Sequence, residues 1–112
     1  MRADDRFRLG HMVDALEAAN RFILDRRRED LNQDQMLAFA LVRAVEIVGE
    51  AASKVSTETR EQHPQVPWLP MVGMRNRLVH AYYDVNLDIL WTTVTVAVPE
   101  LLALLHPLLT EE

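Results

Sequence analysis

A short segment near the centre of the chain, residues 74–85, holds the side chains best suited to chemistry. Arg75 and Asn76 are adjacent, and His80 and Tyr82 follow so that the spacing is Arg-x4-His-x-Tyr. An arginine keeps its charge at physiological pH, and its planar fork matches phosphate oxygens. A histidine can exchange a proton near neutrality. The segment therefore indicates a site that could bind a phosphodiester and assist its cleavage.

Each of these residues also has an ordinary structural interpretation. Arg75 and Arg77 could simply be solvated, or paired with Asp84, Asp88 or Glu50. The histidine could stabilise the end of a helix, where a cation is favourable. The tyrosine could be an aromatic side chain at the edge of the core with its hydroxyl in water. Glu46 is expected to have a structural role, and the role of Glu50 is left open.

The geometry of a regular helix does not bring the motif together. On an ideal helix Arg75 and Tyr82 share a face, whereas His80 lies about 140° from Arg75. Either the helix loosens before His80, or a second copy of the site completes the arrangement. A two-fold dimer would do this, because it places the same segment opposite itself.

Composition narrows the class of protein. The chain has 112 residues, 49% of them apolar, and no cysteine, which predicts one globular domain over residues 1–112 without disulfides or thiolate metal sites. The net charge of −5 argues against a general nucleic-acid coat protein but leaves room for a locally basic cleft. The N-terminus resembles no secretion signal, and charges or prolines interrupt the apolar stretches. We therefore expect a cytoplasmic protein that does not span a membrane.

Four regions show helical periodicity. The first covers about residues 4–28 and ends in three consecutive arginines, which could contact RNA or, more simply, compensate the helix dipole. The second begins near Asn32 or Asp34, both capable N-caps, and runs to about Val55.

A short helical piece over residues 57–63 is plausible, and a third long helix should begin near Pro67 and continue into the His80–Tyr82 region. The last helix covers about residues 87–109, with Pro99 placed to kink or split it. Its β-branched residues would suit a strand, but the sequence offers no partner strand. The predicted fold is therefore an all-α bundle of four to five helices.

With these residues in view, the chain resembles HEPN-domain proteins of the HepT-like ribonuclease toxin family, partners of MntA-type antitoxins with a minimal nucleotidyltransferase fold. The resemblance is carried by Gly73–Asn76 together with His80–Tyr82, and by residues 43–52. Trp68 before the motif, and the segment 88–91 followed by a proline after it, extend the likeness over most of the chain.

The resemblance implies a HEPN-type bundle that acts as a homodimer, with the motifs of both subunits lining one cleft. It implies a metal-independent endoribonuclease without a cofactor, whose RNA substrate supplies its own 2′-hydroxyl nucleophile. Arg75 would bind and neutralise the scissile phosphate, Asn76 would orient it, and His80 would be the general base or acid. These roles suit the chemistry, which needs proton transfer and stabilisation of the phosphorane charge.

The resemblance also implies how the activity is controlled. Tyr82 resembles the residue that an MntA-like antitoxin modifies with AMP, although Tyr83 offers a second phenol beside it. The chain would then be the toxin of a type VII-like HEPN/MNT toxin–antitoxin pair. One alternative is a non-catalytic HEPN subunit that binds substrate for, or scaffolds, a two-component nucleotidyltransferase. Another is a purely structural helical dimerisation domain.

Overall fold

The computed structural model describes residues 1–81 and 84–110, and for residues 80 and 81 it describes the backbone. Helices dominate this part of the chain, so the predicted all-α class is confirmed. The elements in chain order are α1 (Ala3–Phe22), α2 (Asp30–Gln33), α3 (Gln35–Ser53), α4 (Thr57–Gln62), α5 (Trp68–Val72), α6 (Met74–Leu78), β1 (Val79–Ala81), β2 (Asp84–Val85), α7 (Leu87–Thr92), the π-helix η1 (Thr93–Ala97) and α8 (Val98–Thr110).

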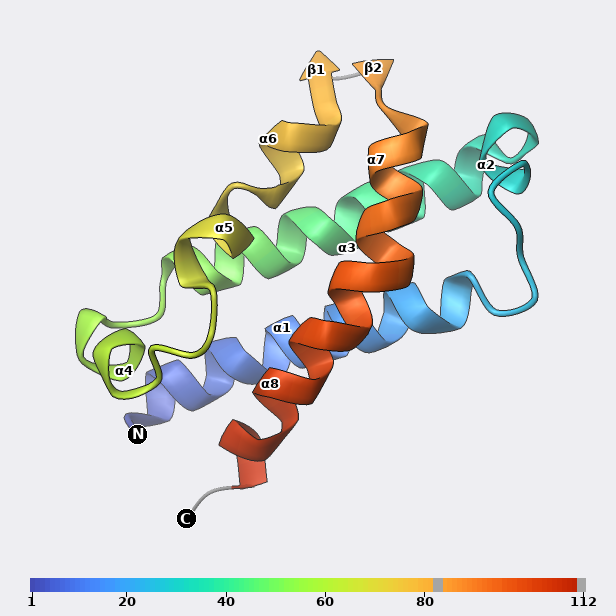
Figure 1. Ribbon diagram of the computed structural model, residues 1–112. Helices are drawn as coiled ribbons and strands as arrows, with labels where there is room; N and C mark the ends of the chain where they lie inside the picture. The colour runs from blue at the N-terminus through green and yellow to red at the C-terminus, as the bar shows by residue number, and fades with distance from the viewer. Residues whose placement is uncertain (82–83, 111–112) are drawn as a thin grey trace.

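The core lies between three long helical segments. The helices α1 and α3 pack side by side along their length, and the α7–η1–α8 segment crosses them, with α8 packed on α1 (Figure 1). The side chains at their contacts are aliphatic and almost fully buried, as burial of apolar surface requires. They include Leu9, Met12, Leu16, Leu41, Val45, Val48, Leu90, Val94, Val98 and Leu105.

The first helix is shorter than its periodicity predicts. It ends at Phe22, so the three arginines lie beyond it and do not compensate its dipole. Instead, Arg26 pairs with Asp34 and Arg28 with Asp88, at N–O distances of 2.5 and 2.8 Å. These pairs connect the turn after α1 to the starts of α3 and α7. Because both of these arginines are engaged within the fold, their position favours a structural role over contact with RNA.

The start of α3 agrees with the prediction. Asp34 is its N-cap, and the side chain accepts a hydrogen bond of 3.0 Å from the amide of Leu37. This hydrogen bond from the Leu37 backbone, together with one from the Arg26 side chain, lowers the pKa of the Asp34 carboxyl. The helix ends at Ser53, two residues before the predicted end.

A buried carboxylate joins α1 to α4. Asp5 is 2% exposed, and its oxygens accept hydrogen bonds from the Ser56 amide (2.9 Å), the Ser56 hydroxyl (2.6 Å) and the Thr59 hydroxyl (2.6 Å). Burial is the largest single influence and raises the pKa of Asp5. The three hydrogen bonds, together with the charge of Arg2, outweigh it, and the pKa is lowered overall.

Replacing Asp5 with asparagine should lower the free energy of unfolding by about 1–3 kcal/mol at pH 7, because an amide cannot accept from all three donors. A carboxyl whose pKa is lower in the folded state stabilises above its unfolded value of 3.8 and loses that effect as the pH falls through the folded value. The difference between the two proteins in urea unfolding should therefore shrink below about pH 4. The control is Asp4→Asn, at an exposed neighbouring residue, which should change the free energy of unfolding little at either pH. Equal unfolding free energies for Asp5→Asn and the parent at pH 7 would contradict the prediction.

The prediction of one continuous third helix is wrong. The chain forms α5, turns at Gly73, forms α6, and then becomes extended at Val79, whose φ and ψ are −125° and 113°. The strand β1 pairs in antiparallel fashion with β2, with Val79 opposite Val85. The Asn86 amide also donates a 2.7 Å hydrogen bond to the Leu78 carbonyl at the base of this hairpin. The extended backbone therefore has partners that the helical prediction did not foresee.

The last helix is irregular at its proline, as predicted. The backbone widens into the π-helix η1 immediately before α8, in which Pro99 is the second residue. A proline has no amide hydrogen to donate to the preceding turn. The hydroxyls of Thr93 and Thr95 donate to the carbonyls of Ile89 and Trp91 in α7, both at 2.7 Å, and so connect the irregular turn to the helix before it. The β-branched residues of this segment therefore form helix, not strand.

By length and composition alone, Leu87–Thr110 is long and apolar enough to cross a membrane, which the analysis of the sequence did not expect. Its most apolar window has a mean hydropathy of 1.6 and is 33% buried within the bundle. The core helix of a globular protein meets the same criterion. Since Leu90, Val94 and Leu105 of this segment are completely buried, we describe it as a core helix.

Candidate active site

A glycine on α3 sets the position of the motif helix. A Cβ built on Gly49 would lie 3.0 Å from the Met71 carbonyl oxygen and 3.1 Å from that of Val72, so α5 rests directly on the backbone of α3. Trp68 anchors the other end of α5, with its ring buried and its indole N–H donating to the His63 carbonyl at 3.0 Å. The helix α6 follows α5 after one residue and is therefore held beside α3.

Arg75, on α6, faces the side of α3. Its Nε atom lies 3.6 Å from Oε2 of Glu46 and makes no hydrogen bond, although this nitrogen is buried. The whole side chain is nevertheless 36% exposed, so its exposed part lies away from Nε. The same Glu46 accepts a 2.8 Å hydrogen bond from Arg43 through its other oxygen. One carboxylate thus lies between two guanidinium groups.

This pairing corrects one part of the sequence-based interpretation. The acidic partner of Arg75 is Glu46, and not Asp84, Asp88 or Glu50. The ion pairs of Glu46 with Arg43 and Arg75 agree with the structural role expected for it. In the sequence, the pairing of Glu46 with Arg43 was indicated by their spacing of three residues, which makes the two side chains neighbours on one helix face.

Arg75 and Asn76 line a groove of about 450 Å³ between α3 and α5–α6. Glu46, Glu50 and Ser53 line its α3 side, and Asn76 is exposed. Two motif residues, which are neighbours in the sequence, therefore lie at one surface. Arg77, two residues beyond Arg75, instead donates a 3.1 Å hydrogen bond to the Pro70 carbonyl.

A second groove of about 350 Å³ adjoins the first and shares Arg43 and Glu50 with it. It lies between α1 and α3, and Arg8, His11 and Lys54 contribute to its walls. The two grooves together carry several cationic groups across α3, although the chain as a whole is acidic. A locally basic surface of this kind suits an anionic strand better than the net charge suggests.

His80 lies on β1, and not on the helix that carries Arg75. The helix-wheel separation of these two residues therefore does not apply, because the backbone leaves the helix at Val79. Of the two possibilities raised by the sequence, the helix does loosen before His80. Tyr82 and Tyr83 lie outside the described residues, so their assignment stays a prediction.

No group of three or more histidine and carboxylate side chains able to hold a metal ion occurs among the side chains that the structure describes. The groups that line the groove are guanidinium, carboxylate, carboxamide and hydroxyl. Of these, the guanidinium, carboxamide and hydroxyl groups can bind a phosphate and orient it by charge and hydrogen bonds, whereas the carboxylates repel it.

Comparison with known families identifies the chain. Residues 12–108 match the family described as "Ribonuclease HepT-like". The chain belongs to the HepT-like ribonuclease family. The matched region includes α3, α5, α6 and β1, so the groove of this HepT-like protein and the whole Arg-x4-His-x-Tyr motif fall within it.

Several relatives of this HepT-like chain carry related names. It is 37% identical over 93 residues to "Probable ribonuclease HepT" of Thermococcus cleftensis, which covers 83% of this chain and 84% of the relative. It is 39% identical over 93 residues to a protein named "Putative RNase" of Methanocaldococcus jannaschii, covering 80% and 85% of the two chains. A similarly named protein of Caldanaerobacter subterraneus is 45% identical over 73 residues, or 65% of each chain. No solved structure matches this HepT-like chain.

Proposed function

We propose that this HepT-like protein is a metal-independent endoribonuclease, and that it acts in the cytoplasm as the toxin of a toxin–antitoxin pair. The observation that carries the proposal is the groove in which Arg75 and Asn76 lie together, about one helical turn before the strand that bears His80. Membership of a ribonuclease family and the names of its relatives support the same substrate class. The substrate would be RNA, because its own 2′-hydroxyl can serve as the nucleophile.

In the proposed reaction the 2′-oxygen attacks the adjacent phosphorus and loses its proton to a base. The bond from phosphorus to the 5′-oxygen breaks, and that oxygen takes up a proton. His80 would be the base or the acid, and Arg75 would stabilise the charge on the phosphorane oxygens while Asn76 orients them. The products are a 2′,3′-cyclic phosphate and a 5′-hydroxyl.

Two copies of the chain would complete this site. A single imidazole can act as base or as acid in one step, whereas a two-fold dimer supplies two imidazoles and two guanidinium groups to a common cleft. We therefore propose a homodimer as the active species. Its formation is measured by light scattering coupled to gel filtration, and an active monomer would contradict it.

The direct test is cleavage of single-stranded RNA by the purified protein in excess EDTA. We expect cleavage to continue, and the products to carry 2′,3′-cyclic phosphate ends detectable by mass spectrometry. The same RNA with 2′-O-methyl groups should remain intact, because its nucleophile is blocked. Loss of all activity in EDTA, with recovery on adding Mg²⁺, would refute the metal-independent mechanism.

The proposed control of the toxin is AMP addition to Tyr82 by an MntA-like nucleotidyltransferase antitoxin. The added phosphate charge would compete with RNA for the cationic groups of the site. Co-expression with such a partner should add AMP-sized mass increments to the intact protein, and these should be absent from Tyr82→Phe. Tyr83→Phe is the matched control, and increments retained in Tyr82→Phe but lost in Tyr83→Phe would move the acceptor to the neighbouring phenol.

The ion pair between Glu46 and Arg75 favours one alternative, in which the chain is a non-catalytic substrate-binding or scaffold subunit of a two-component nucleotidyltransferase. An arginine already paired with a carboxylate is partly neutralised before substrate arrives. That protein would bind nucleotide or its partner and cut no RNA, so the cleavage assay separates the two functions.

A further inference from the structure

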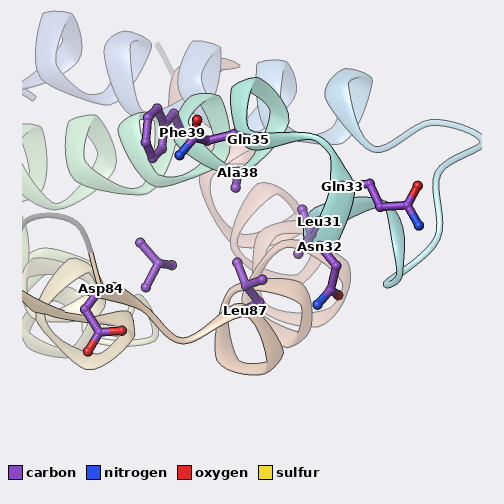
Figure 2. A pocket seen from close by; sticks show the side chains of 9 residues that line it. Leu31, Asn32, Gln33, Gln35, Ala38, Phe39, Asp84 and Leu87 are labelled. Carbon is purple, nitrogen blue, oxygen red and sulfur yellow. The ribbon is translucent and has the colours of Figure 1, made fainter.

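A separate pocket of about 430 Å³ lies between the start of α3 and the β1–β2 hairpin. Figure 2 shows its walls, with Phe39 and Gln35 coming from α3, Asn32 from α2 and Asp84 from β2. Aliphatic side chains, including Leu87, complete the lining. The pocket therefore combines one aromatic ring and several hydrogen-bonding groups over an apolar floor, which is the usual make-up of a small-ligand site.

The aromatic ring is available for stacking. Phe39 is 54% exposed, although the same helix buries Leu41, Val45 and Val48 in the core. The fold thus gains little from this large apolar side chain. A ring face open to a pocket can stack with a nucleobase, and such stacking tolerates any base because every base has a π-face.

The polar groups of the pocket are also available. Among the side chains that the structure describes, neither Asp84 nor Gln35 takes part in a hydrogen bond or an ion pair. Asn32 accepts a 2.6 Å hydrogen bond from Arg28 through its oxygen, which orients its amide group. The pocket therefore offers a carboxylate, which only accepts, and carboxamide groups, which donate and accept.

The pocket and the candidate active site both have α3 as one wall. Asp84 is opposite Ala81 in the hairpin, and Ala81 is the residue that follows His80 in β1. Phe39 and Glu46 are seven residues apart on α3, so they share a face and lie about 10.5 Å apart along its axis. Glu46 in turn contacts Arg75. A nucleotide strand held at Arg75 could thus reach the pocket without leaving this face of α3.

We propose that this pocket binds an unpaired base of the RNA beside the cleaved phosphate, with the base stacked on Phe39 and bonded to Asp84. The inference rests on the proposed ribonuclease function. The carboxylate selects bases that present donors, since it has none of its own. Adenine and cytosine offer an exocyclic amino group and guanine offers two adjacent donors, whereas the one N–H of uracil lies between two acceptors. The subsite should therefore disfavour uracil.

The test is fluorescence anisotropy with labelled hexamers of A, C or U in which every ribose is 2′-O-methylated, so that binding is measured without cleavage. Phe39→Ala should weaken binding of the A and C hexamers about five- to hundredfold. Asp84→Asn should bring the affinities for C and U together. The matched controls are Met36→Ala, an 83% exposed apolar residue on α3 outside the pocket, and Asp14→Asn, an exposed carboxylate on α1.

Unchanged binding by Phe39→Ala, or equal affinity of the parent for C and U, overturns the subsite. So does a change in molar mass of Phe39→Ala in light scattering, because the ring would then belong to an interface between subunits. Cleavage of ordinary RNA is measured in parallel. A parent that cleaves while both variants bind and cleave normally refutes the subsite and leaves the ribonuclease function standing. A parent that shows the expected binding differences but cleaves nothing supports base binding in this pocket, and it refutes both the ribonuclease function and the placement of the base beside a cleaved phosphate.

Discussion

His80→Ala should cleave RNA about 10²- to 10⁴-fold more slowly than the parent protein, the range expected when a general acid–base group is removed. The 2′-hydroxyl is a weak nucleophile until its proton is taken, and no other group of comparable proton affinity is expected in the motif. Initial rates on a fluorescent single-stranded RNA, at fixed pH and saturating enzyme, measure the effect.

The matched control for this variant is His106→Ala. His106 is on α8, half exposed, and 3.4 Å from Glu17, far along the chain from the motif. Its removal should leave the cleavage rate within about twofold, as expected for a surface substitution away from the chemistry. Equal rates for His80→Ala and the parent would show that His80 has no role in the mechanism, independently of how the two subunits are arranged.

Arg75→Ala should lower kcat about 10²- to 10³-fold, because a fixed donor to the developing phosphorane charge is lost. Arg75→Lys should recover only part of this loss, since an ammonium group keeps the charge but not the planar fork. The fold should survive both changes. Glu46 keeps its 2.8 Å hydrogen bond from Arg43, so the carboxylate is not left without a partner.

Arg77→Ala controls for loss of positive charge on the same short helix. Its side chain is exposed and hydrogen bonded to the Pro70 carbonyl, so it serves the turn between α5 and α6. Circular dichroism and single-turnover kinetics together separate unfolding from a slower chemical step. If Arg75→Ala and Arg77→Ala lose activity to the same extent, Arg75 has no special role at the phosphate.

Local signals in the sequence predicted the helices well. The N-cap at Asp34, the apolar stripe of α3 and the irregularity at Pro99 all depend on residues within a few positions of each other, which a sequence pattern can record. The end of α1 was placed too late, because arginines are good helix formers and the turn is revealed only by the ion pairs of Arg26 with Asp34 and of Arg28 with Asp88.

The motif region was harder to predict for a physical reason. The strand at Val79 exists because β2 pairs with it, and a strand of two residues leaves almost no periodic signal. The partner of Arg75 depends on how closely α5 approaches α3, which Gly49 decides. The sequence thus identifies the reactive residues, while their neighbours follow from contacts between segments far apart in the chain.

The β1–β2 hairpin is attached to the helices in a way that affects how strongly a change in it alters stability. Its base is closed by the bond from the Asn86 amide to the Leu78 carbonyl, and the side-chain oxygen of Asn86 also caps α7 by accepting a 3.0 Å hydrogen bond from the Ile89 amide. The first pair of the hairpin still belongs to the core, because Val79 is buried and Val85 packs against the core cluster. We therefore expect that a modification beyond this pair can alter activity with little change in the melting temperature.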